Sequence, residues 1–254
     1  MSRVFRLKPF IMKLDYYNLC DKSYDDAFNK VKLLGRYPWV GKDYKNRPYH
    51  VLIIGDSHYA VDNNKKFCPD VYLNFINNYY STREIVSCVI KDVINKESTW
   101  TMYRNLINTF TSYTPEEVKY LWSNVAFYNF IQRPMEEIHQ EPSKGDNITG
   151  WVCFNEIINI LKPDFCLFFG KRSENEMTTL ESLESLYTRN EDDVCNKTSP
   201  VVGVIETKQG TKTRFRIIQH SAYRGYSPAA WYKYLCNKEI DCMSQVDRNY
   251  KHNK

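Results

Sequence analysis

The sequence has no pair of cysteines at C-x-x-C spacing, although eight cysteines are spread over its 254 residues. It therefore gives no support for a zinc ribbon or an iron–sulfur site. It also has no apolar run long enough to cross a bilayer, and no signal peptide at its start. We therefore expect a protein of the reducing cytoplasm, away from membranes, that needs no metal or other cofactor.

A strong charge of either sign is also lacking. Lys and Arg number 35 and Asp and Glu number 30, which gives a net charge of +5. This mildly basic balance permits a phosphate-bearing partner without requiring one. Aromatic residues are plentiful, at 15% of the chain with 20 Tyr. Tyr offers a flat surface with a polar tip that suits bases and sugars, but the codon usage of an AT-rich genome would produce the same excess.

One apolar run, Val51–Ile54, is followed directly by a glycine and four residues with polar or reactive side chains. Val and Ile favour strands, and the absence of polar alternation predicts a strand buried on both faces, as in parallel sheets. In such sheets ligands bind beyond the carboxyl ends of the strands. An ordinary polar turn would give the same pattern. The residues expected at the mouth of a site are Gly55, Asp56, Ser57, His58 and Tyr59.

Strand-like and amphipathic segments alternate along the chain. Strands are expected at residues 51–54, 124–131, 165–169, 201–206 and 214–219. Helices are expected at residues 23–34, 69–80, 83–95, 101–110, 115–122, 151–161 and from 227 onward. This order predicts an α/β fold, namely a three-layer α/β/α sandwich around a central, mostly parallel sheet of four to five strands. We expect a monomer with a single domain over residues 1–254, including a helical N-terminal extension (1–47) and a polar C-terminal tail (241–254).

Three other predicted strands also end on residues that can bind or react. Because parallel strands present their carboxyl ends at one edge of a sheet, these residues are expected to converge with the loop that follows the first strand. They are Asn129, Phe130 and Gln132 after the second strand, Gly170, Lys171 and Arg172 after the third, and His220, Ser221, Tyr223 and Arg224 after the last.

Taken together, these segments resemble the uracil-DNA glycosylase superfamily. Gly55–Tyr59 resembles the loop that follows its first strand, and Val125–Gln132 resembles its strand with a base-reading Asn. Leu161–Lys171 resembles its path from "K-P" into a strand ending in "G-K", and His220-Ser221 resembles its late H-P-S loop. The four segments occur in the order of the superfamily, but they cover only a small part of the chain, so each match alone is weak.

The resemblance implies a hydrolase that cleaves the N-glycosidic bond of uracil or another modified base, in DNA or in a nucleotide, as in base-excision DNA repair. Asp56 would orient a water molecule and His220 would stabilise the departing base. Asn129 carries both a donor and an acceptor and would read one edge of the base. The residues implied to stack on the base or to enter the duplex are Tyr59, Phe75, Phe130, Tyr223 and Arg224.

The sequence departs from this family at three positions. His58 stands where the family has a proline, and Ser57 stands where several of its members have Asp or Asn. No proline separates His220 from Ser221. A non-catalytic protein that binds a nucleotide or DNA is therefore an alternative.

A second alternative is an enzyme of a different class. Gly55–His58 also resembles the opening block of SGNH/GDSL esterases, in which Ser57 would be the nucleophile and His220 its base. In those enzymes an Asp stands three residues before the His, but here that position is Ile217. The histidine would then lack its orienting acid, and this reading is less favoured than the glycosylase.

Overall fold

The structure is a computed structural model that describes residues 16–62, 64–97, 99–177, 188–189, 193–195 and 198–250. Its strands are β1 (Trp39–Val40), β2 (Val51–Gly55), β3 (Val125–Asn129), β4 (Phe165–Phe169), β5 (Thr188–Arg189), β6 (Val201–Glu206) and β7 (Lys212–Ile218). Its α-helices are α1 (Asp25–Phe28), α2 (Pro69–Asn77), α3 (Ser81–Ile94), α4 (Thr101–Phe110), α5 (Pro115–Asn124), α6 (Lys144–Leu161), α7 (Pro228–Lys238) and α8 (Ile240–Val246). Three short 3₁₀ helices complete the set: η1 (Tyr17–Leu19), η2 (Tyr44–Asn46) and η3 (Lys171–Glu174).

The strands form one sheet in the order β1-β3-β2-β4-β7-β6-β5. Its four central strands, β3, β2, β4 and β7, run parallel, whereas β1, β6 and β5 pair antiparallel at the two sides. The α/β class is confirmed, but the prediction of a mostly parallel sheet of four to five strands is wrong. The described sheet has seven strands and is mixed. One reason is the tight β6–β7 connection through Gly210, at φ +77°, because so short a turn can only join antiparallel strands.

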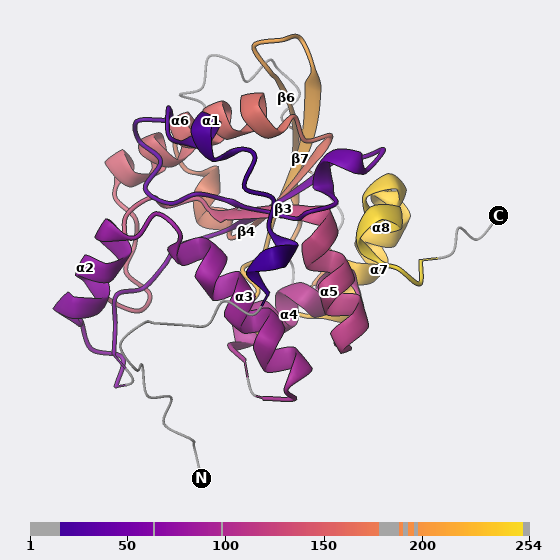
Figure 1. The fold of residues 1–254 in the computed structure, drawn as a ribbon. Coiled ribbons are helices and arrows are strands. Elements are labelled where there is room, and N and C mark those ends of the chain that lie inside the picture. Colours follow the sequence, from indigo (N-terminus) through magenta and orange to yellow (C-terminus); the bar gives the residue numbers. More distant parts are fainter. Residues whose placement is uncertain are drawn as a thin grey trace.

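The central strands are covered by helices on both faces. Successive strand residues point to opposite faces, so Val51 and Ile53 pack with α3, α4, α5, α7 and α8. Leu52 and Ile54 pack on the other face with α1 and α6. Figure 1 shows the two groups of helices on opposite sides of the sheet. Because β2 is buried on both faces along its whole length, the first polar side chain it can offer to a ligand comes after Gly55.

The described part of the predicted helical N-terminal extension, residues 16–47, is only partly helical. Its α-helix, α1, has only four residues, and the segment then contributes strand β1 to the sheet. Trp39 of β1 is fully buried and donates a hydrogen bond from Nε1 to the carbonyl oxygen of Trp122, at 2.7 Å. The segment therefore closes one side of the core.

The predicted polar tail over residues 241–254 is also wrong in its described part, residues 241–250. These residues begin within α8, and Cys242, Met243 and Val246 are fully buried against the main core. Their spacing of one and four residues places them on one face of a helix. This short apolar stripe packs α8 against β2 and α5.

Most of the other predicted elements are confirmed. Strand β4 has the predicted bounds, and α5 begins after Thr114, whose side chain accepts a hydrogen bond from the N–H of Glu117 at 3.4 Å. Helix α6 begins at Lys144, well before the predicted start at 151. The cause is a capping box, in which the side chains of Ser143 and Asp146 each accept a hydrogen bond from the other residue's backbone N–H.

Candidate functional site

The carboxyl ends of the four parallel strands meet at one edge of the sheet. Gly55 of β2 lies opposite Asn129 of β3 in the register, and Phe169 of β4 lies opposite Ile218 of β7. The polar residues that follow these strands therefore gather along the same edge. The loop after β2 is tied to the loop after β3, because the Ile131 N–H donates to the carbonyl oxygen of Asp56, at 2.9 Å.

The carboxyl group of Asp56 is buried and has no partner among the described residues. The residue is 7% exposed, and no described residue donates a hydrogen bond to its carboxylate or forms an ion pair with it. The chain passes close to it at Gly170, where φ is +145° and an added Cβ would lie 3.5 Å from the carboxyl carbon. Burial raises the pKa of Asp56 to about 6; the charge of Arg172 opposes this rise and that of Glu141 adds to it. A carboxylate left in this state is free to bind a ligand or to orient water.

The backbone holds His220 in one tautomer. The N–H of Ala222 donates to Nδ1 of His220 at 3.1 Å, so the neutral ring carries its proton on Nε2. Burial, together with the nearby Arg172 and His139, lowers the pKa of His220 to about 4. At neutral pH the ring is therefore uncharged, and its Nε2–H has no partner among the described residues. His220 can thus donate a hydrogen bond to a ligand.

Arg172 connects these two groups. It belongs to η3, which begins directly after Gly170, and its charge acts on both Asp56 and His220. Its guanidinium donates from one terminal nitrogen to the carbonyl oxygen of Gln140, at 3.0 Å. The other terminal nitrogen lies 2.9 Å from a carboxylate oxygen of Glu141. The carboxylate after β2 and the imidazole after β7 therefore lie within the field of the same cation.

Beneath this edge, His58 and Asn129 form a buried polar pair. Nε2 of His58 lies 3.0 Å from Nδ2 of Asn129 and 3.1 Å from the hydroxyl of Thr82. The imidazole also stacks on the ring of Phe75, with centroids 5.0 Å apart. Burial and the charge of Arg36 hold the pKa of His58 well below its usual range, so the ring is neutral. Asn129 then donates to His58, and its Oδ1 is left buried without a partner.

The two serines of the predicted site are both buried. Ser57 is 7% exposed and Ser221 is fully buried, with an unpartnered Oγ. No described base contacts the Ser57 hydroxyl, because Nδ1 of His220 accepts from the backbone and Nε2 of His58 faces Thr82 and Asn129. Ile217 is buried within β7, as its apolar character predicted. This geometry offers Ser57 no general base.

The aromatic residues of the predicted site take different positions. Phe130 is buried, edge-on to Trp151 with centroids 5.1 Å apart, so it has no face to offer a base and the expected stacking role is corrected. Tyr59 is half-buried beside Met135. Tyr223 is 60% exposed, and Arg224 next to it is exposed as well. These last two residues stand at the rim, where they could reach a large substrate.

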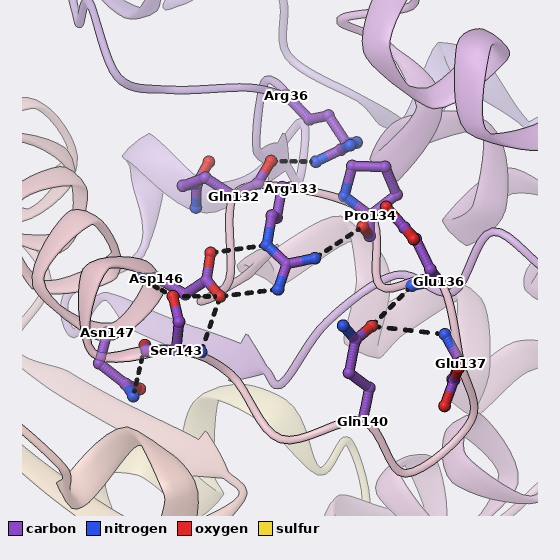
Figure 2. Close-up of polar contacts among 10 residues, drawn as sticks. All are labelled: Arg36, Gln132, Arg133, Pro134, Glu136, Glu137, Gln140, Ser143, Asp146 and Asn147. Atoms are coloured by element: carbon purple, nitrogen blue, oxygen red, sulfur yellow. Dashed lines mark hydrogen bonds and ion pairs between the residues drawn. The ribbon is translucent and has the colours of Figure 1, made fainter.

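The loop between β3 and α6 is fixed by polar contacts at both ends (Figure 2). Arg36 donates to the carbonyl oxygen of Gln132 at 2.6 Å, and Arg133 makes two bonds to the carboxylate of Asp146, at 2.8 and 2.9 Å. An open depression beside this pair is lined by Ile76, Gln132, Arg133, Ser143, Gly145, Asp146 and Thr149. Asp146 already supplies negative charge at the start of α6, so this depression is not prepared for an anion.

Sequence reasoning noted Arg172 at the end of a strand but gave it no role, and it missed Glu141, His139 and Thr82. Glu141 and His139 lie in the loop between β3 and α6, and nothing in their local pattern sets them apart from solvated loop residues. The described residues contain no group of three or more His, Cys, Asp or Glu side chains able to hold a metal ion.

No protein-family model matches the chain, and no curated protein matches it significantly. The resemblance seen in the four segments therefore depends on those residues alone. Within the described part of the chain, no helix is both long enough and apolar enough to span a membrane.

Proposed function

We propose that the protein is a hydrolase of the uracil-DNA glycosylase type, which removes a uracil or other modified base from DNA or a nucleotide. The observation that carries this proposal is the pairing at the sheet edge. Within the described part of the chain, Asp56 is a buried carboxylate without partners and His220 is a neutral imidazole with a free Nε2–H. They come from different loops, and the charge of Arg172 acts on both.

The two groups supply what cleavage of an N-glycosidic bond requires. As the bond breaks, positive charge develops on the sugar and negative charge on the base. Asp56, ionised above pH of about 6, orients the attacking water and stabilises the cationic sugar. His220 donates its Nε2–H to the departing base, and it does so as a neutral group that needs no prior protonation. The proton of the attacking water passes to Asp56 and from there to solvent. The base leaves as an anion that accepts a hydrogen bond from the Nε2–H of His220, and it then takes up a proton from solvent.

The non-catalytic alternative keeps one specific observation in its favour. Asn129, the residue expected to read the base, is 5% exposed, and its Nδ2 is taken by His58. A ligand can reach its unpaired Oδ1 only if the surrounding side chains move. The esterase alternative is weaker, since no described base contacts Ser57.

The direct test is base release from oligonucleotides. Single-stranded and duplex oligonucleotides with uracil or other altered bases are incubated with the protein, and abasic sites are then cleaved with alkali. Asp56→Asn and His220→Ala should each lower turnover by a factor of about 10² or more while leaving the fold intact. Asp241→Asn, an exposed position on α8, is the matched control and should behave as the wild type.

The alternatives predict different results. Intact nucleotide binding without strand breaks on any substrate would favour the non-catalytic reading. Labelling of Ser57 by a serine-directed phosphonate, with turnover of p-nitrophenyl acetate, would favour the esterase. If Asp56→Asn released bases as fast as the wild type, the Asp56 carboxylate would have no role in the mechanism.

A further inference from the structure

The guanidinium of Arg172 has two partners, one in the backbone and one exposed carboxylate that a ligand can replace. One terminal nitrogen donates to the carbonyl oxygen of Gln140, and the other pairs with the carboxylate of Glu141. The side chain of Arg172 is 29% exposed, whereas that of Glu141 is 73% exposed. An ion pair whose acidic partner is mostly in water adds little stability, since each group is well solvated when they separate.

The fixed side of this arrangement is built into the loop. The side-chain oxygen of Gln140 accepts hydrogen bonds from the backbone N–H groups of Glu136 and Glu137, at 2.8 and 3.4 Å (Figure 2). This contact sets the position of Gln140, and therefore of the carbonyl oxygen that orients Arg172. Apart from its ion pair with Arg172, the Glu141 carboxylate has no partner among the described residues.

Arg172 also stands at the reaction centre. It lies two residues after Gly170, whose backbone packs against the carboxyl group of Asp56. Its charge acts on Asp56 and on His220, the two groups proposed to surround the scissile bond. In a nucleotide the phosphate is joined to the sugar at the 5′ or 3′ position, so it lies close to the glycosidic bond. A cation at this place is therefore within reach of a substrate phosphate.

We propose that Arg172 binds a phosphate group of the substrate, and that Glu141 occupies the place of this phosphate in the ligand-free protein. The proposal rests on the proposed function, because it assigns the phosphate to the nucleotide whose base is removed. It identifies the substrate class as a nucleotide or nucleic acid and excludes a free nucleoside. Phosphate, like carboxylate, matches the planar fork of Arg, and a terminal phosphate carries more charge than a carboxylate.

The test measures phosphate binding without reference to catalysis. Binding of inorganic phosphate is followed by isothermal titration for the wild type and for single variants. Arg172→Gln should weaken it about tenfold or more, while Arg172→Lys keeps the charge and should retain part of the affinity. Glu141→Gln should strengthen binding, because it removes the competing carboxylate. Glu137→Gln removes one negative charge from the same loop, and its side chain does not pair with Arg172, so it serves as the matched control.

A second set of measurements identifies the source of the phosphate. Deoxyuridine, deoxyuridine 5′-monophosphate and the trinucleotide TpUpT are compared as ligands of the wild type and of Glu141→Gln. Tighter binding of the monophosphate indicates a terminal phosphate, and tighter binding of the trinucleotide indicates a backbone diester; either result supports the proposal. Equal binding of all three would overturn it.

Two further outcomes would also overturn the proposal. One is a phosphate affinity that Arg172→Gln leaves unchanged. The other is a rise in phosphate affinity in Glu137→Gln as large as that in Glu141→Gln. The second would show a general effect of loop charge. Failure of the proposed function looks different. If the protein binds phosphate through Arg172 but releases no base, the phosphate site stands and the proposed glycosylase function fails. If it releases bases with no dependence on Arg172, the glycosylase function stands and the phosphate site fails.

Discussion

Asn129 donates from Nδ2 to Nε2 of His58 over 3.0 Å, and this bond joins the end of β3 to the loop after β2 inside the protein. Because both side chains are buried, each needs the other to satisfy its polar atoms. The pair therefore fixes the side-chain amide of Asn129, and Oδ1 becomes the atom left free.

Replacement of His58 by Phe should show how much this hydrogen bond contributes to the free energy of unfolding. The new ring keeps the stack on Phe75 but offers no acceptor, so Nδ2 of Asn129 loses its partner in a buried place. We expect a loss of about 1–3 kcal/mol in the free energy of unfolding, measured by urea denaturation. Thr82→Val removes only the contact of the Thr82 hydroxyl with the same nitrogen and leaves Asn129 its acceptor, so it is the matched control and should cost less. Equal losses in the two variants would contradict this account.

Two Gly→Ala substitutions should have opposite effects. An added Cβ at Gly55 would lie 2.1 Å from Oδ1 of Asn129 and 3.2 Å from the ring of Phe127. Asn129 must then move, so Gly55→Ala should destabilise the fold by about 1–3 kcal/mol and weaken ligand binding. Gly145 lies in the first turn of α6, and its nearest neighbour would be Ser143 Oγ at 3.7 Å. Gly145→Ala should therefore stabilise by up to about 1 kcal/mol. Thermal unfolding of both variants provides the comparison.

The pH dependence of turnover should show a single acid limb near neutrality. Asp56 must be ionised, and its pKa is raised to about 6 by burial, so activity should rise with pH through a midpoint of about 6. His220 has a pKa of about 4 and is already neutral over this range, so it adds no further limb there. The profile of kcat/KM reports the free protein. A limb in which activity falls as pH rises from 6 to 8 would require a protonated group and would contradict the proposed roles.

The sequence predicted the central part of the fold well because burial on two faces leaves a clear pattern. Strand β4 and the start of α5 were found from an unbroken apolar run and from a Thr-Pro cap. The two-residue side strands, β1 and β5, were missed for a physical reason. Strand β1 has only two residues, too few to show a period, and its place depends on pairing with β3.

The sequence could predict only those site residues that directly follow a strand. Asp56 and His220 follow buried strands, and parallel pairing brings them to one edge of the sheet. Glu141 could not be found in this way, because its contact with Arg172 depends on how the loop from β3 to α6 folds back. The burial of Phe130 was missed for a similar reason, because its contact with Trp151 depends on how α6 packs against the end of β3.

The Asp56 carboxylate should also lower stability at neutral pH, which gives a test independent of activity. Its folded-state pKa of about 6 lies above its ordinary value of 3.8, so between these values the folded protein binds more protons than the unfolded chain. Stability from this group is therefore present at low pH and is lost as pH rises through about 6, by up to about 3 kcal/mol. Asp56→Asn removes this loss.

The free energy of unfolding of Asp56→Asn should therefore exceed that of the wild type at pH 7, and the difference should shrink toward pH 4. Urea denaturation across this range measures it. Comparison of the two proteins cancels other titrating groups, such as Asp92, whose pKa is also raised to about 6. A difference that stays constant with pH would mean that the Asp56 carboxylate is well solvated or paired, and it could not then act as the unpartnered base of the proposed site.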